Sequence, residues 1–221
     1  MRDKIVHMIA LQSSLNVQIN PEWRSAHYPW RRAIWMEAAE LVEHIGWKWW
    51  KKNHASSDIQ ARLEVVDIFH FLLSHLIGCY ESEEDLIGVL TEALGQANIE
   101  PSVMIQDKAV LIRAVESMVG LAARENCSDM SLLHSFVTVS HLVGLDGATL
   151  YRLYVAKNML NRYRQENGYK DGSYQKMWNG QEDNQHLESI IQSLPDMHGS
   201  AFEYSVLAAL DVVYSSHKLA A

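Results

Sequence analysis

Two stretches decide the fold: Glu37-Ala38-Ala39-Glu40-Leu41, and Glu64-Val65-Val66-Asp67 followed by Ile68-Phe69-His70-Phe71-Leu72-Leu73-Ser74. Each stretch places two carboxylates three residues apart in a strongly apolar context. On a helix, residues i and i+3 lie on one face, one turn apart. The two stretches therefore predict two helices that each present a pair of carboxylates on one side.

The carboxylate pairs also predict chemistry. Like charges one turn apart repel, and a charge near a core is costly to desolvate. An isolated E-x-x-E pattern is usually a solvated helix face, but such a face would contain more lysine, arginine and glutamine than the flanks Ile34-Trp35-Met36 and Ile68-Phe69 provide. Oxygen donors from two facing helices suit Mg²⁺, with water and substrate phosphates completing its shell. We therefore expect a metal site for phosphate chemistry at Glu37, Glu40, Glu64 and Asp67.

Helical spacing extends along nearly the whole chain. Only four prolines occur, and apolar residues recur every three or four positions, with few alternating runs. Ser57-Asp58 can cap a helix, and Gly46 and Gly78 can end the two carboxylate-bearing helices. We expect an all-α, multi-helix bundle with no sheet, with helices near residues 4–16, 30–45, 59–77, 85–97, 103–124, 129–144, 147–168 and 200–219.

Composition limits the possible classes of protein. The 221 residues, 48% hydrophobic and 21% charged, are ordinary for a globular protein that buries a substantial core. The net charge of −8 argues against a nucleic-acid polymer as partner. Cys79 and Cys127 form neither a disulfide framework nor a zinc pattern, which is typical of a reducing compartment. With a polar start and no long apolar run, the sequence predicts a cytoplasmic protein without a membrane span.

Polar side chains follow one face of the expected helix over residues 147–168. Lys157, Asn161 and Arg164 fall at i, i+4 and i+7 and lead into a glycine-punctuated loop over residues 168–186. A surface stripe is the simpler interpretation, but two cations beside amides would also suit a triphosphate. Long loops in compact domains are often functional, so this segment is a candidate binding region.

Two aromatic features leave their roles open. Trp47, Trp49 and Trp50 stand beside lysines, so packing at a helix end and stacking on a base or ligand are equally good interpretations. His70 shares the helix face of Asp67. A buried, hydrogen-bonded histidine and a ligand contact are equally consistent with that position.

Together these segments resemble the dimeric, all-α dUTPase family, part of the MazG-like all-α NTP pyrophosphatase superfamily. The superfamily shares the two acidic motifs. Similarity to the dimeric dUTPases rests on three further segments: Leu11-Gln12-Ser13-Ser14-Leu15-Asn16, Gly46-Trp47-Lys48-Trp49-Trp50-Lys51, and the run from Lys157 to Tyr174 with Trp178 to Asn184. These blocks occur in the family's order and cover roughly residues 8–78 and 150–185.

The resemblance implies hydrolysis of dUTP to dUMP and pyrophosphate, with dUDP also a plausible substrate, by a homodimer. It implies two or three Mg²⁺ ions at the four carboxylates, with Glu37 or Glu40 also orienting or deprotonating the attacking water. The residues it places around uracil and deoxyribose are Gln12, Asn16, Trp49, His70 and Phe71. Those it places around the phosphates are Lys157, Asn161, Arg164, Tyr169 and Lys170.

The chain is expected to form a single α-helical domain over residues 1–221. Residues 1–80 and 150–185 would make the active-site core, with 81–149 and 186–221 as additional helices in a cap or dimerisation layer. One alternative is a related Mg²⁺-dependent pyrophosphohydrolase acting on dCTP or another non-standard NTP. Another is a non-catalytic helical binding module, which would use the carboxylates in ion pairs and the tryptophans as an interface.

Overall fold

The computed structural model describes residues 1–50, 57–95 and 107–220, and it confirms the expected all-α fold. None of the helices in this part of the chain is long and apolar enough to cross a lipid bilayer. Residues 96–97 and 103–106 of two expected helices and Lys51 of the tryptophan segment lie outside the described residues. In chain order the elements are α1 (Arg2–Ile19), α2 (Trp30–His44), α3 (Asp58–Cys79), α4 (Glu83–Gly95), α5 (Lys108–Ala122), α6 (Asp129–Leu142), α7 (Gly147–Glu166), β1 (Met177–Trp178), β2 (Gln181–Glu182), α8 (Asp183–Ser193) and α9 (Gly199–Ala220).

The α3 helix is the centre of the fold. It begins at the predicted cap, where the Ser57 hydroxyl accepts a hydrogen bond from the Gln60 amide. Apolar side chains cover most of its circumference, which is the pattern of a helix buried on all sides. It pairs with α2 and also contacts α1, α6 and α7. Carboxylates on α3 are therefore carried into the interior, and Glu64 is only 3% exposed.

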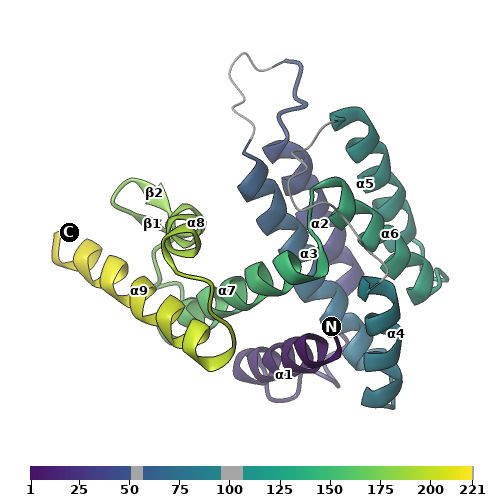
Figure 1. Cartoon of the computed structure of the whole chain (residues 1–221), viewed down its shortest axis with the longest axis horizontal. Coiled ribbons are helices and arrows are strands. Elements are labelled where there is room, and N and C mark those ends of the chain that lie inside the picture. Colours follow the sequence, from purple (N-terminus) through teal and green to yellow (C-terminus); the bar gives the residue numbers. More distant parts are fainter. Residues whose placement is uncertain (51–56, 96–106, 221) are drawn as a thin grey trace.

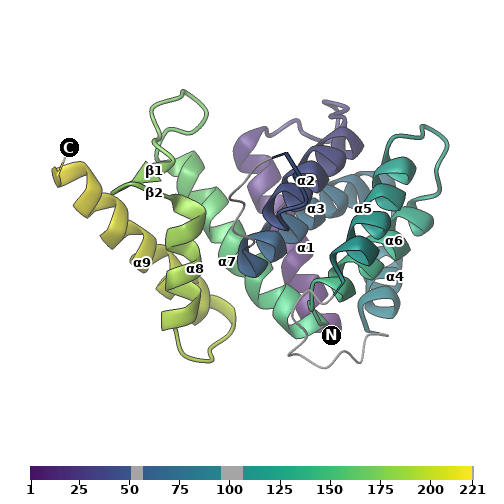
Figure 2. The same cartoon turned by 90° about the horizontal axis from the view of Figure 1, so that it is seen from above.

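The α7 helix connects two groups of helices (Figures 1 and 2). One group contains α2 to α6, and the other contains α8, α9 and the short β-ribbon, with α1 packed beneath α7. The Asp146 carboxylate caps α7 by accepting a hydrogen bond from the Thr149 amide at 2.7 Å. In the core, Phe69 of α3 stacks on Phe136 and meets Tyr154 of α7 edge-on. This packing brings the polar stripe of α7 beside the carboxylates of α3.

The segment expected to be one long loop over residues 168–186 contains a hairpin and the start of α8. Met177-Trp178 pairs with Gln181-Glu182 in antiparallel register. Asn179 and Gly180 connect the strands with φ of 50° and 83°, the left-handed conformation that two-residue hairpins favour. The Asn-Gly pair was the signal for this hairpin. Here the expectation of no sheet was wrong, because a local turn preference formed a two-stranded ribbon within an all-α fold.

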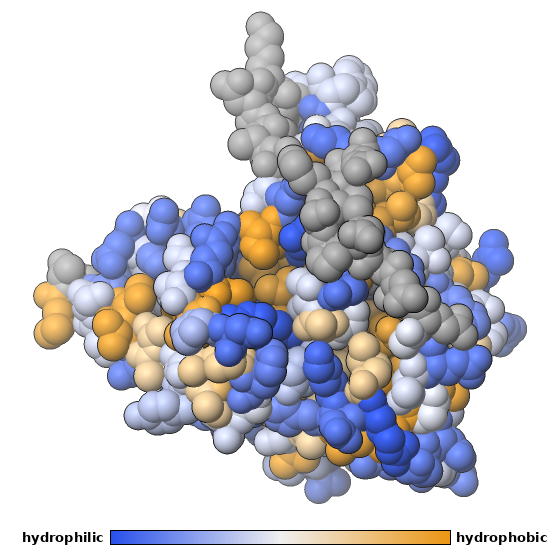
Figure 3. Space-filling view, viewed as in Figure 1, coloured by the Kyte–Doolittle hydropathy of each residue, from blue (hydrophilic) through white to orange (hydrophobic). Residues whose placement is uncertain are grey.

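The face shown in Figure 3 is mostly hydrophilic, with hydrophobic side chains gathering over α9 and α5. On α9 the buried side chains recur every four residues, from Phe202 to Tyr214. The opposite side of the same helix exposes Tyr204, Val212 and Leu219. These exposed side chains leave an apolar surface on this helix.

Candidate active site

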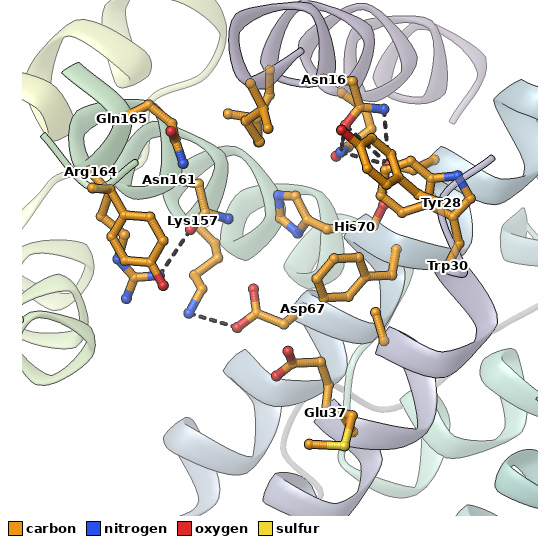
Figure 4. A pocket seen from close by; sticks show the side chains of 18 of the residues that line it. Asn16, Tyr28, Trp30, Glu37, Asp67, His70, Lys157, Asn161, Arg164 and Gln165 are labelled. Carbon is orange, nitrogen blue, oxygen red and sulfur yellow. Dashed lines mark hydrogen bonds and ion pairs between the residues drawn. The ribbon is translucent and has the colours of Figure 1, made fainter. Parts of the chain in front are cut away.

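A cavity of about 710 Å³ collects most of the predicted site residues between α1, α2, α3 and α7 (Figure 4). The first three helices are consecutive in the chain, but α7 follows α3 only after more than sixty residues, so the complete site is a product of the tertiary fold. The predicted residues that line it are Gln12, Asn16, Glu37, Glu40, Glu64, Asp67, His70, Phe71, Lys157, Asn161, Arg164 and Tyr169.

The two carboxylate pairs face each other across the α2–α3 hairpin. Carboxylate oxygens of Glu37, Glu40 and Glu64 lie within 4.8 Å of one another. Burial raises the pKa of Glu37 to about 8, helped by the nearby charges of Asp67, Glu64 and Glu40. Burial and the neighbouring carboxylates also raise the pKa of Glu40. This donor set fits a hard divalent cation, since such an ion would replace the proton and relieve the repulsion.

Two basic side chains contact the carboxylates of α3. Lys157 Nζ lies 2.7 Å from Asp67 Oδ2 and donates to Asn184 Oδ1 at 2.7 Å, although Lys157 is only 1% exposed. His44 Nε2 lies 3.2 Å from Glu64 Oε1, and its hydrogen bond with Glu64 raises the pKa of His44. Sequence reasoning assigned no role to His44 or Asn184, because nothing in their spacing indicates these partners.

Arg164 is held in place at the far end of the carboxylate cluster. Its Nε and one terminal nitrogen each donate to an oxygen of Asp183 at 2.8 Å, and the other terminal nitrogen donates to Asn161. The Tyr174 hydroxyl donates to Asp183 at 2.8 Å. Although burial opposes it, the Arg164 guanidinium holds the pKa of Asp183 below its ordinary value. Asp183 was missed by sequence reasoning, since its partner is a neighbour only in the folded chain.

The other end of the cavity combines aromatic walls with a neutral histidine. Trp30 and Phe71 line this end, with their ring centroids 6.3 Å apart. Burial lowers the pKa of His70 to about 4, so the ring is neutral at pH 7. His70 Nδ1 lies 2.9 Å from the Val66 carbonyl, which can only accept, so Nδ1 carries the proton. His70 Nε2 is then a buried acceptor without a partner among the described residues.

Two amides from α1 complete this end of the cavity. Gln12 and Asn16 are each 3% exposed, and both donate to the hydroxyl of Ser74 on α3, at 2.9 and 3.1 Å. Tyr154 of α7 contacts the oxygen of Gln12 at 2.6 Å. Ser74 lies in the predicted α3 stretch but had no predicted role, and neither did Tyr154.

Two predicted substrate contacts lie outside the cavity lining formed by the described residues. Trp49 is 84% exposed and meets Trp50 edge-on. Lys170 is exposed and donates to the Ile19 carbonyl at 3.1 Å. Their contact with a substrate stays a prediction.

A second group of potential metal ligands, His75, Cys79 and Asp129, lies apart from this cavity. Arg31 donates to Asp129 at 2.5 Å, and His75 lies 2.8 Å from the same oxygen. Arg31 also donates to the carbonyl of Cys127. The guanidinium supplies the charge that a metal ion would bring, so we interpret the group as an ion pair that ties α2 to the α5–α6 connection.

A family model described as dUTPase matches residues 4–169 of the chain. The matched segment begins in α1 and ends just after α7, so it includes both carboxylate pairs and Lys157. A comparison with curated proteins returned no match.

Proposed function

The chain belongs to the dUTPase family and hydrolyses dUTP, and from that premise we propose that its four paired carboxylates hold Mg²⁺ while water attacks the α-phosphorus, giving dUMP and pyrophosphate. The observation that carries this proposal is the order of groups in one cavity. The carboxylates lie between a cationic end, with Lys157 and Arg164, and an end lined by Asn16 and His70. A nucleotide with its base at the second end would bring its phosphates to the carboxylates and cations.

The metal ions would be held in the hairpin of α2 and α3. Glu37, Glu40, Glu64 and Asp67 supply hard oxygen donors for two or three Mg²⁺ ions. When bound, Mg²⁺ neutralises phosphate charge and lowers the pKa of water. The pKa of Glu37 is raised to about 8 in the metal-free site, which supports Glu37 as the group that accepts a proton from the attacking water. Glu40 is the alternative. The new bond from water oxygen to the α-phosphorus forms as the bond to the pyrophosphate oxygen breaks.

The remaining site residues would position the nucleotide. We propose that the base and deoxyribose contact Gln12, Asn16, His70 and Phe71, with Trp49 reaching them from the segment that follows α2. We propose that the phosphates contact Lys157, Asn161, Arg164, Tyr169 and Lys170. The same attack on dUDP would release phosphate in place of pyrophosphate, so dUDP is proposed as a second substrate.

We further propose that the chain acts as a homodimer of single α-helical domains. The core would comprise residues 1–80 and 150–185, with residues 81–149 and 186–221 as additional layers. The exposed apolar side chains of α9 support the proposal that this helix contacts the second subunit. Sedimentation should give a species of twice the 25.2 kDa chain mass. A species of one chain mass at all concentrations would contradict the dimer.

The test of the reaction is pyrophosphate release from dUTP, dCTP, dTTP and UTP, each with Mg²⁺ and with EDTA. We expect turnover of dUTP that EDTA abolishes. Turnover of dCTP in place of dUTP would keep the carboxylate chemistry and favour the related pyrophosphohydrolase. Turnover of dUTP that persists in EDTA would contradict the metal assignment.

A further inference from the structure

Ser74 is a fully buried residue in the cavity wall, and the hydrogen bonds of its hydroxyl have a fixed direction. Ser74 Oγ lies 2.9 Å from the His70 carbonyl oxygen one turn earlier, whereas Asn16 Oδ1 is farther, at 3.3 Å, so the single hydroxyl proton points to His70. A carbonyl oxygen can only accept, so donation to His70 leaves two lone pairs on the Ser74 oxygen. Those lone pairs accept from the amide nitrogens of Gln12 and Asn16 at 2.9 and 3.1 Å. Ser74 therefore turns the nitrogen of each amide toward itself.

Tyr154 fixes the same arrangement from the opposite side. Its hydroxyl lies 2.6 Å from Gln12 Oε1, and the alternative acceptor, the Met8 carbonyl, is farther at 3.3 Å. With its oxygen held by Tyr154, Gln12 directs its nitrogen toward Asn16 Oδ1 at 3.0 Å. Asn16 is then held at both ends, by Ser74 on its nitrogen and by Gln12 on its oxygen.

The fixed orientation of the Asn16 amide determines which base it can pair with. Among the described residues these bonds use one N–H and one lone pair of the Asn16 amide, which lines the cavity and keeps a second of each. Uracil offers an acceptor, O4, beside a donor, N3–H. Cytosine offers the reverse, a donor N4–H₂ beside an acceptor N3. An amide that rotates by half a turn could serve either base, whereas an amide of fixed orientation can serve only one.

We propose that Ser74 and Tyr154 are positioning residues that fix the Asn16 amide in the orientation for uracil and so reject cytosine. This inference rests on the proposed function, in which the base lies against Asn16. Neither Ser74 nor Tyr154 needs to contact the nucleotide. They act on the choice of base through Asn16, because a base that does not match the fixed amide leaves buried polar groups unpaired.

The test compares Ser74→Ala and Tyr154→Phe with matched controls. Ser140→Ala removes another buried serine hydroxyl, which has no partner among the described residues. Tyr151→Phe removes a hydroxyl on the same helix that contacts His7. The readout is the ratio of kcat/KM for dUTP to kcat/KM for dCTP. We expect this ratio to fall roughly tenfold or more in Ser74→Ala and Tyr154→Phe, and to stay at the wild-type value in both controls.

The outcomes separate the inference from the function on which it rests. A wild-type enzyme that prefers dUTP, with variants that keep its ratio, overturns the positioning role and leaves the proposed function intact. A wild-type enzyme that turns over dCTP as well as dUTP also overturns it. A wild-type enzyme with no Mg²⁺-dependent turnover would instead contradict the proposed function. If a variant is folded but inactive, the ratio of Kd for dCMP to Kd for dUMP is measured in its place. A fall in that ratio supports the inference, and an unchanged value overturns it.

Discussion

Lys157 Nζ lies 2.7 Å from Asp67 Oδ2, so a nearly inaccessible cation of α7 neutralises one carboxylate of the α3 pair. The other three carboxylates of the cluster lie within 4.8 Å of one another, and without this cation Asp67 would add to their repulsion. The ion pair also links the helix that carries the metal-site carboxylates to the helix that carries the proposed phosphate contacts. Lys157 is therefore expected to matter both for the metal-free fold and for turnover.

The first prediction is that Lys157→Met lowers kcat/KM for dUTP by at least about a hundredfold, because a charged contact to phosphate is lost. Without metal, the free energy of unfolding should fall by up to about 3 kcal/mol, since the partly buried Asp67 loses its partner. Added Mg²⁺ should raise Tm more in this variant than in wild type. Lys108→Met, an exposed lysine on α5, is the control. Wild-type kcat/KM in Lys157→Met would contradict the prediction.

The second prediction concerns the pH dependence of Mg²⁺ binding. Glu37 has a pKa of about 8 in the metal-free site, against 4.5 ordinarily, so below pH 8 an incoming ion must displace its proton. The apparent Mg²⁺ affinity should therefore rise with pH, by up to about tenfold per unit, and level off above the pKa. Because the folded state holds this proton more tightly than the unfolded chain, metal-free stability should fall as pH rises between these two pKa values.

Titration calorimetry in buffers of different ionisation enthalpy measures this proton release directly. The control is Glu37→Gln, which cannot titrate and should bind Mg²⁺ with a weaker pH dependence while losing nearly all turnover. Equal pH dependence in wild type and Glu37→Gln would show that another group releases the proton.

The helices were predictable from the sequence because their apolar spacing and caps are local. Ser57 caps α3 as expected, and the apolar side chains over most of that helix carry its carboxylates into the interior. The hairpin at Asn179-Gly180 was missed because two-residue strands leave no alternating pattern, only the turn pair itself. The bounds of α8 (Asp183–Ser193) were not predicted either, because no helix was placed between residues 168 and 200.

Only those parts of the site that belong to sequence motifs were predictable. The carboxylates and the α7 stripe meet in one cavity as expected. The partners that fix them do not follow from spacing: Asp183 for Arg164, His44 for Glu64, and Ser74 for the α1 amides. Each of these is a contact between separate elements, so it exists only once the helices have packed.

The third prediction is that Trp49→Ala leaves stability within about 0.5 kcal/mol of wild type, because its side chain is 84% exposed. If Trp49 stacks on the bound base, the KM for dUTP should nevertheless rise about tenfold. Steady-state kinetics with urea unfolding separates the two effects, and Trp50→Ala tests whether the effect belongs to Trp49 alone. An unchanged KM would remove Trp49 from the substrate contacts.

The fourth prediction is that Asp183→Asn destabilises the fold by about 3 kcal/mol, because it leaves the Arg164 guanidinium without the carboxylate that binds it twice. Tyr174→Phe removes a single hydrogen bond to Asp183 and should cost about 1 kcal/mol. Asp196→Asn is the matched control, since Asp196 is 88% exposed and lies 3.9 Å from Arg152.

Urea unfolding of the three variants measures these differences. The released guanidinium would also lose its fixed direction at the cavity, so KM for dUTP should rise in Asp183→Asn while the control keeps the wild-type value. Equal stability of Asp183→Asn and Asp196→Asn would mean that the buried pair contributes nothing to the fold. In that case Arg164 would be held at the cavity by its contact with Asn161 and not by Asp183.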